Sequence, residues 1–148
     1  MATNERFIAA SRQRVFAVLA DGWAYSNWVV ATSHMRAVEQ GWPAVGSRLF
    51  HAAGSWPITT RDETVVEEMV PDERLALLAK GRPIGEARVV LELADANGGC
   101  HVTMHETPVA GPGKWLHNPL AEKLLVRRNT ESLDRLAAIA EQRAVPSE

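Results

Sequence analysis

The fold is decided by residues 119–143, which read PLAEKLLVRRNTESLDRLAAIAEQR. Asn118 offers an N-cap and Pro119 stands at the first helical position, so the segment is predicted to form one long helix that ends at about Arg143. Side chains of one helix face recur at steps of four and three residues. They are Glu122, Val126, Asn129, Leu133, Leu136 and Ala140. The C-terminal half of this stripe is apolar, whereas its N-terminal half carries two polar side chains.

The middle of the chain follows a period of two, which is typical of strands that bury one face. Ile84–Ala94 alternates most cleanly, with apolar side chains on one face and Arg88 and Glu92 on the other. Asn97-Gly98-Gly99 is a strong hairpin signal. Six strands are predicted: His34–Glu39, Ser47–Ser55, Ile58–Val70, Arg74–Lys80, Ile84–Ala94 and Cys100–Thr107. Because no helix separates them, they indicate an antiparallel meander.

The N-terminal segment adds a short first strand and two short helices. The partly apolar stretch Glu5–Ala10 stops at Ser11, which is a suitable N-cap for a helix over Arg12–Ala20. Asp21-Gly22 breaks that helix, and a second short helical segment is predicted over Trp23–Trp28.

Only the C-terminal helix is long enough to cover one face of such a sheet. The sequence therefore predicts a single α+β domain over residues 1–148, in which a curved antiparallel sheet of six to seven strands grips that helix. We expect the packed core over about residues 5–142 and a frayed tail over 143–148.

Composition narrows the classes of function. Apolar residues make up 46% of the chain and charged residues 23%, as in globular proteins. The net charge of −2, with basic residues spread along the chain, gives no reason to expect a nucleic-acid partner. We expect no membrane span, no signal peptide and no cofactor. The single Cys100 cannot form an internal disulfide, so a cytoplasmic location is expected.

Three segments carry a family resemblance: SRQRVFAVLAD at residues 11–21 followed by Trp28, GSRL at 46–49, and RRNTESLDRL at 127–136. In this order, from about residue 7 to residue 142, the chain resembles the START-like or Bet v 1-like superfamily (SRPBCC). That group is often labelled the polyketide cyclase/dehydrase and lipid-transport family. The resemblance implies a helix-grip fold with a cavity between the sheet and the long helix. Its members range from lipid carriers to cyclases and chaperone cofactors, so the fold alone does not give the activity.

A ligand site is expected beneath the polar half of the helix stripe, because a strongly curved sheet and a helix cannot pack along their full length. Val102, Met104 and Glu106 share the face of the last strand that we expect to be buried. The predicted lining is Trp23, Trp28, Phe50, Val102, Met104, Glu106, Trp115, Leu116, Glu122, Val126 and Asn129.

Glu106 and Glu122 are the candidate catalytic acids. If Glu106 ends a buried apolar row, its environment favours a proton on the carboxyl group and suits acid/base chemistry. The alternative is that Glu106, next to Thr107-Pro108, has reached the solvated end of the strand. Glu122 either contacts the ligand or serves the helix dipole. Asn129 either contacts the ligand or binds the sheet backbone.

The histidines do not indicate a metal site. On a strand, His101 and His105 lie about 13 Å apart. One zinc ion, with bonds of about 2 Å, cannot hold both. His34, His51 and His117 are expected to be surface or structural residues.

Three functions remain open from the sequence, and the leading hypothesis is a protein that binds a small apolar or aromatic molecule, such as a lipid or a polyketide. The second is an enzyme of the cyclase/aromatase kind, and the third is an interaction module with an exposed apolar patch. The sequence does not decide between a monomer and a homodimer.

Overall fold

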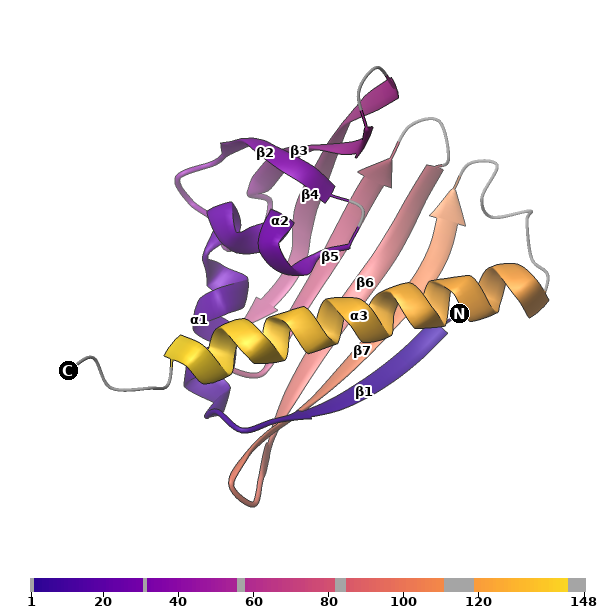
Figure 1. The fold of residues 1–148 in the computed structure, drawn as a ribbon. Helices are drawn as coiled ribbons and strands as arrows, with labels where there is room; N and C mark the ends of the chain where they lie inside the picture. Colours follow the sequence, from indigo (N-terminus) through magenta and orange to yellow (C-terminus); the bar gives the residue numbers. More distant parts are fainter. Residues whose placement is uncertain (1, 31, 56–57, 82–84, 111–118, 144–148) are drawn as a thin grey trace.

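The computed structural model describes residues 2–30, 32–55, 58–81, 85–110 and 119–143 (Figure 1). Its elements, in chain order, are β1 (Ala2–Ile8), α1 (Arg12–Ala20), the 3₁₀ turn η1 (Gly22–Ala24), α2 (Tyr25–Trp28), β2 (Thr32–Val38), β3 (Arg48–Ser55), β4 (Ile58–Val70), β5 (Arg74–Gly81), β6 (Gly85–Ala96), β7 (Gly99–Ala110) and α3 (Pro119–Arg143). The predicted order of short helices, strands and one long helix is confirmed.

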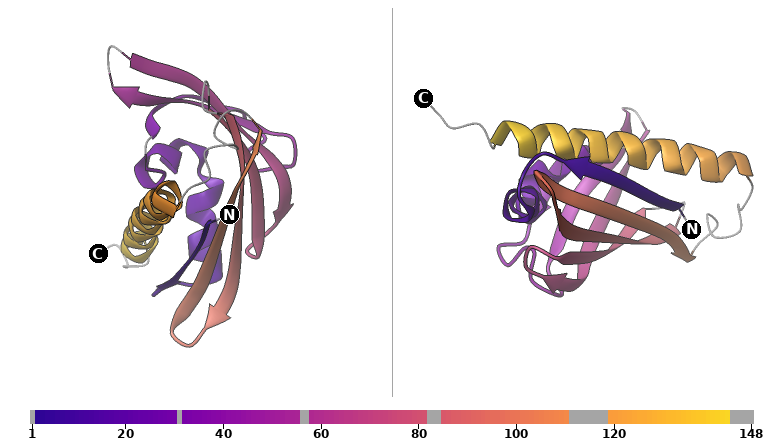
Figure 2. Two further views of the ribbon diagram at one scale, coloured as in Figure 1. Left: turned by 90° about the vertical axis from the view of Figure 1, so that its right-hand side faces the viewer. Right: turned by 90° about the horizontal axis from the view of Figure 1, so that it is seen from below.

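The seven strands form one antiparallel sheet in the order β1-β7-β6-β5-β4-β3-β2. The sheet curves around α3, with α1 and α2 on the same side, as both views of Figure 2 show. Strand β7 runs to Ala110, past the predicted end at Thr107, because its ladder with β6 continues through Pro108 and then, across a register shift between Glu86 and Ala87, to Ala110. The helix-grip fold class is therefore confirmed.

The N-terminal helix begins as predicted. The Ser11 hydroxyl accepts a hydrogen bond from the Arg14 backbone N–H at 3.2 Å, which caps α1 at its N-terminus. The face of α1 that carries Val15, Val18 and Leu19 is buried in the core. The predicted second helix consists of the η1 turn and the single turn of α2.

Helix α3 packs mainly on β1, α1 and α2 rather than across the middle of the sheet. Its C-terminal half is well buried, since Leu133, Leu136 and Ala140 are all within the core. Its first turns project beyond that core: the side chains of Leu120 and Leu124 are 67% and 59% exposed. Among the described residues, no helix is both long enough and apolar enough to cross a membrane.

Candidate ligand-binding site

The buried row of β7 ends in an ion pair. Val102, Met104 and Glu106 all face the core, as predicted, and Glu106 is 8% exposed. The alternative that Glu106 lies at a solvated strand end is therefore wrong. Both carboxylate oxygens accept hydrogen bonds from Nη2 of Arg128 on α3, each at 2.7 Å. A buried carboxylate needs such a partner, and Arg128, which the sequence analysis missed, supplies it.

The interior has one wall formed by β1, β7 and α3, which carries Glu106 and Arg128, and a second wall formed by α2, β3 and β4. Three side chains joined by hydrogen bonds lie on the second wall. Nε2 of His51 on β3 is 3.0 Å from the Thr64 hydroxyl on β4, and the Tyr25 hydroxyl on α2 is 3.3 Å from the same oxygen. The rings of Tyr25 and His51 lie 5.3 Å apart, and those of Tyr25 and Trp28 lie 5.6 Å apart. All four side chains are buried, so His51 is not a surface residue.

The two walls are electrostatically connected through Tyr25. Burial is the main cause that raises the pKa of the Tyr25 hydroxyl, and the hydrogen bond with Thr64 lowers it. The Glu106 carboxylate raises this pKa further, while the Arg128 guanidinium lowers it. The two members of the ion pair thus act on the Tyr25 pKa in opposite directions, and both effects are smaller than that of burial.

The described residues leave three buried polar side-chain atoms without a hydrogen-bond partner: Asn4 Oδ1, His51 Nδ1 and Asn129 Nδ2. The other amide atom of Asn4, Nδ2, donates to the Val126 carbonyl at 2.9 Å and to the Thr130 hydroxyl at 3.0 Å. Asn4 and Asn129 thus belong to the wall formed by β1 and α3, and His51 to the wall formed by β3. A buried polar group without a partner destabilises a protein by about 1–3 kcal/mol, so each of these atoms calls for an explanation.

Small side chains form the sheet surface between the two walls. In the sheet, Ala79 of β5 pairs with Thr64 of β4 on one side and with Ala87 of β6 on the other. Because Thr64 is buried and strands alternate, Ala79 faces the interior, in the same row as Leu75 and Leu77. Leu75 and Leu77 are fully buried, but Ala79 and Ala87 are only half-buried. The interior face of the sheet is therefore less completely covered at Ala79 and Ala87 than at Leu75 and Leu77.

The match to a family model covers nearly the whole chain. The model described as "Polyketide cyclase / dehydrase and lipid transport" matches residues 2–141. The chain belongs to this family. No curated protein matches the chain.

Solved structures similar to this member of the polyketide cyclase/dehydrase and lipid-transport family share its fold at low identity. A protein from Rhodobacter sphaeroides is 21% identical, with 95% of this chain and 91% of that chain covered and a TM-score of 0.74. The di-domain ARO/CYC StfQ from the steffimycin biosynthetic pathway is 12% identical, with 96% and 50% covered and a TM-score of 0.72. Ara h 8.0201 is 11% identical, with 95% and 96% covered and a TM-score of 0.73.

Several residues predicted to line the site in this family member lie elsewhere. Phe50 lies on the face of β3 opposite to Leu49 and His51, with the guanidinium groups of Arg36 and Arg48 5.9 and 5.2 Å from its ring centroid. Its predicted inward orientation is wrong, because β3 alternates with Leu49 and His51 inward.

The remaining predicted residues divide into three groups. Trp28 and Asn129 are buried as expected. Trp23 is 59% exposed and Glu122 is also exposed, so neither side chain points into the core, and Val126 is partly exposed at the edge of α3. Trp115 and Leu116, together with His117 and Asn118, lie outside the described residues. Whether the described members of the set bind a ligand stays a prediction.

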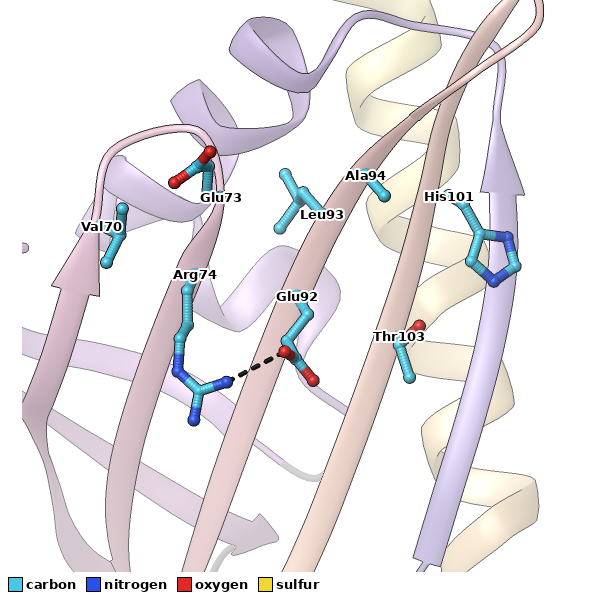
Figure 3. A pocket seen from close by; sticks show the side chains of 8 residues that line it. All are labelled: Val70, Glu73, Arg74, Glu92, Leu93, Ala94, His101 and Thr103. Carbon is cyan, nitrogen blue, oxygen red and sulfur yellow. Dashed lines mark hydrogen bonds and ion pairs between the residues drawn. The ribbon is translucent and has the colours of Figure 1, made fainter.

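The outer face of the sheet carries a depression of about 450 Å³ (Figure 3). It is lined by Val70, Glu73, Arg74, Glu92, Leu93, Ala94, His101 and Thr103. Arg74 Nη1 donates to Glu92 at 3.0 Å across it, and the same carboxylate lies 3.3 Å from His105 Nε2. These charged groups already pair with one another on a solvated surface, so the depression does not resemble the predicted apolar site.

Acid is expected to destabilise this family member through His51. Burial lowers the pKa of the imidazole, an effect that the Asp62 carboxylate opposes and the Arg36 guanidinium reinforces. The unfolded chain therefore binds a proton more readily than the folded protein. Stability is full above about pH 6.5 and falls as the pH drops from there toward the lower folded-state pKa. Thermal unfolding between pH 8 and pH 5 measures this slope, and an equal slope in His51→Gln contradicts the assignment.

Proposed function

We propose that the protein binds a small apolar or aromatic molecule between the sheet and α3. The observation that carries the proposal is the set of buried, unpartnered polar atoms on the two walls, Asn4 Oδ1, His51 Nδ1 and Asn129 Nδ2. Ligand sites are typically apolar with a few placed polar groups, and this interior has that composition.

The apolar part of the proposed site is the sheet between the two walls. Leu77, Val89 and Met104 face the interior from β5, β6 and β7, and Ala79 and Ala87 leave the neighbouring surface half-buried. A ligand that covers this surface gains roughly 25 cal/mol for each Å² of apolar area removed from water.

Family membership supports the same ligand class. The family description names polyketide cyclases and lipid transport, and StfQ, which shares the fold, is an ARO/CYC of the steffimycin pathway. Both point to carbon-rich ligands. We do not extend the proposal to catalysis by the predicted acids, because Glu106 is bound by Arg128 and Glu122 lies on the exposed surface of α3.

The proposal is tested with the neutral fluorescent probe N-phenyl-1-naphthylamine. Saturable enhancement of its fluorescence is expected with the unaltered protein. Ala79→Phe should weaken binding by about tenfold or more, since the larger ring occupies the surface that the probe covers and about 1.4 kcal/mol is lost for each factor of ten. Leu78→Phe is the matched control, because Leu78 alternates to the other face of β5 and should leave the affinity unchanged.

Two results contradict the proposal. One is the absence of saturable binding. The other is binding that survives Ala79→Phe but is lost in Leu124→Ala, since Leu124 lies on the exposed surface of α3. The second result would favour an interaction module with an apolar patch.

A further inference from the structure

His51 stands at one end of a hydrogen-bond chain whose other members are Thr64 and Tyr25. Its Nε2 is 3.0 Å from the Thr64 hydroxyl, whereas its Nδ1 is buried and has no partner. The residue as a whole is 93% buried, because its exposed fraction is 7%. The unpartnered nitrogen is therefore part of an ordered polar group on the interior wall, not of a mobile surface side chain.

The protons of this chain can be placed in more than one way, and every placement leaves hydrogen-bonding capacity at His51 Nδ1. If Tyr25 donates to Thr64 and Thr64 donates to His51 Nε2, the imidazole proton is on Nδ1, which is then an unused donor. If His51 Nε2 donates to Thr64, in whichever direction the bond between Thr64 and Tyr25 runs, Nδ1 is an unused acceptor. A hydroxyl oxygen of a ligand can satisfy either form, and a carbonyl oxygen satisfies the first.

The charges around His51 disfavour an ionised ligand group at this place. Asp62 is directly opposite His51 in the β3–β4 ladder and is 6% exposed. Arg36 donates to the backbone carbonyls of His51 and Asp62, at 3.3 and 3.2 Å. The Glu106 carboxylate on the other wall is paired with Arg128, so this ion pair adds little net charge at His51, and Asp62 is the carboxylate that disfavours an anion there. A carboxylate at His51 Nδ1 would lie near the Asp62 carboxylate and lose its hydration in the interior.

We propose that the ligand is an apolar, neutral molecule that carries an oxygen, and that its hydroxyl or carbonyl group completes the Tyr25–Thr64–His51 chain by bonding to His51 Nδ1. The inference rests on the proposed function and adds to it the polar group of the ligand and the residue that recognises it. Phenols and neutral ketones meet this description, whereas plain hydrocarbons and fatty or aromatic carboxylates do not.

The test compares three probes of similar shape at pH 7.5: 2-naphthol, 2-methylnaphthalene and 2-naphthoate. Each is titrated against the protein with bound N-phenyl-1-naphthylamine, and the displacement gives its affinity. We expect 2-naphthol to bind about tenfold more tightly than 2-methylnaphthalene, since it satisfies a buried polar group that the hydrocarbon leaves unpaired. The carboxylate is expected to bind most weakly of the three.

Variants assign the preference to His51. In His51→Phe, 2-naphthol and 2-methylnaphthalene should bind equally, and the affinity for 2-methylnaphthalene should be preserved, which also shows that the site is intact. Thr64→Val keeps the shape but breaks the chain, and should reduce the preference as well; it replaces His51→Phe if that variant does not fold. His101→Phe, on the outer face of the sheet, is the control and should keep the tenfold preference.

The outcomes separate the two proposals. Equal affinities for the naphthol and the hydrocarbon in the unaltered protein overturn the inference, although the site would still bind apolar molecules. A preference that survives both His51→Phe and Thr64→Val overturns the assignment to this chain, as does tightest binding of the carboxylate. Failure of every probe, including N-phenyl-1-naphthylamine itself, overturns the proposed function together with the inference.

Discussion

Leu136→Ala is expected to destabilise the protein by about 2–5 kcal/mol, while Leu124→Ala changes the free energy of unfolding by less than about 0.5 kcal/mol. Both leucines belong to α3, and both substitutions remove the same atoms and favour the helix equally. They differ in environment: Leu136 is fully buried in the core, whereas Leu124 is 59% exposed. The difference between the two variants therefore measures packing under the C-terminal half of α3 alone.

Urea unfolding followed by far-ultraviolet circular dichroism measures both values, and an unchanged slope with urea concentration keeps them comparable. A loss of about 2 kcal/mol or more in Leu124→Ala would contradict the description of α3, since it would require a partner surface on its first turns. Repeating that measurement at several protein concentrations would show whether a second copy supplies the surface, because stability then depends on concentration.

The behaviour of α3 could be predicted from its sequence because helical periodicity is a local property. The stripe at steps of four and three places Asn129, Leu133, Leu136 and Ala140 on one face, and all four are buried. The alternation of Val102, Met104 and Glu106 likewise gave the correct buried face of β7. In β7 and in the C-terminal half of α3 the buried side chains lie on the predicted face, so the period orients these segments. The predicted stripe does not hold in the first turns of α3, where Glu122 and Val126 are exposed.

The orientation of β3 could not be derived in the same way. Leu49 and Phe50 are adjacent and both apolar, so alternation allows either to face inward. The neighbouring strand decides: Leu49 pairs with the fully buried Thr64, and His51 pairs with Asp62. The pattern of small and polar residues in β4 was a signal for this register, but only once the β3–β4 pairing is known.

The polar contacts across the interior could not be predicted from the sequence either, because they also depend on how distant elements are placed. Glu106 and Arg128 are 22 residues apart, and Tyr25 and Thr64 are 39 apart. Each pair joins two elements whose relative placement depends on the curvature of the whole sheet. A buried acid in a family member of this fold does predict a cation nearby, since an unpaired buried charge is unfavourable. Arg127, Arg128 and Lys123 were equal candidates in the helix sequence.

Arg128→Met is expected to lower the free energy of unfolding by about 2 kcal/mol. The substitution keeps a long side chain on α3 but leaves the carboxylate of Glu106, whose side chain alone is 10% exposed, without its partner. Removing one member of a fully buried ion pair costs about 3–5 kcal/mol. The smaller value is expected here because the Arg128 side chain is 39% exposed, and water then screens part of the interaction. Urea unfolding of the variant measures the loss.

The pair Arg135 and Glu131 supplies the matched control on the same helix. Its atoms are 3.0 Å apart, but both side chains are about half exposed, so Arg135→Met should change stability by less than about 0.5 kcal/mol. Adding Glu106→Gln to Arg128→Met should recover most of the loss, because the neutral amide no longer carries an unpaired charge into the interior. A double-mutant cycle compares the unaltered protein, Arg128→Met, Glu106→Gln and the double variant. It gives the coupling energy between Glu106 and Arg128, expected at about 1–3 kcal/mol. If Arg128→Met changes the free energy of unfolding as little as Arg135→Met does, water reaches Glu106 freely. The Glu106 carboxylate would then not belong to a water-free interior beside Tyr25.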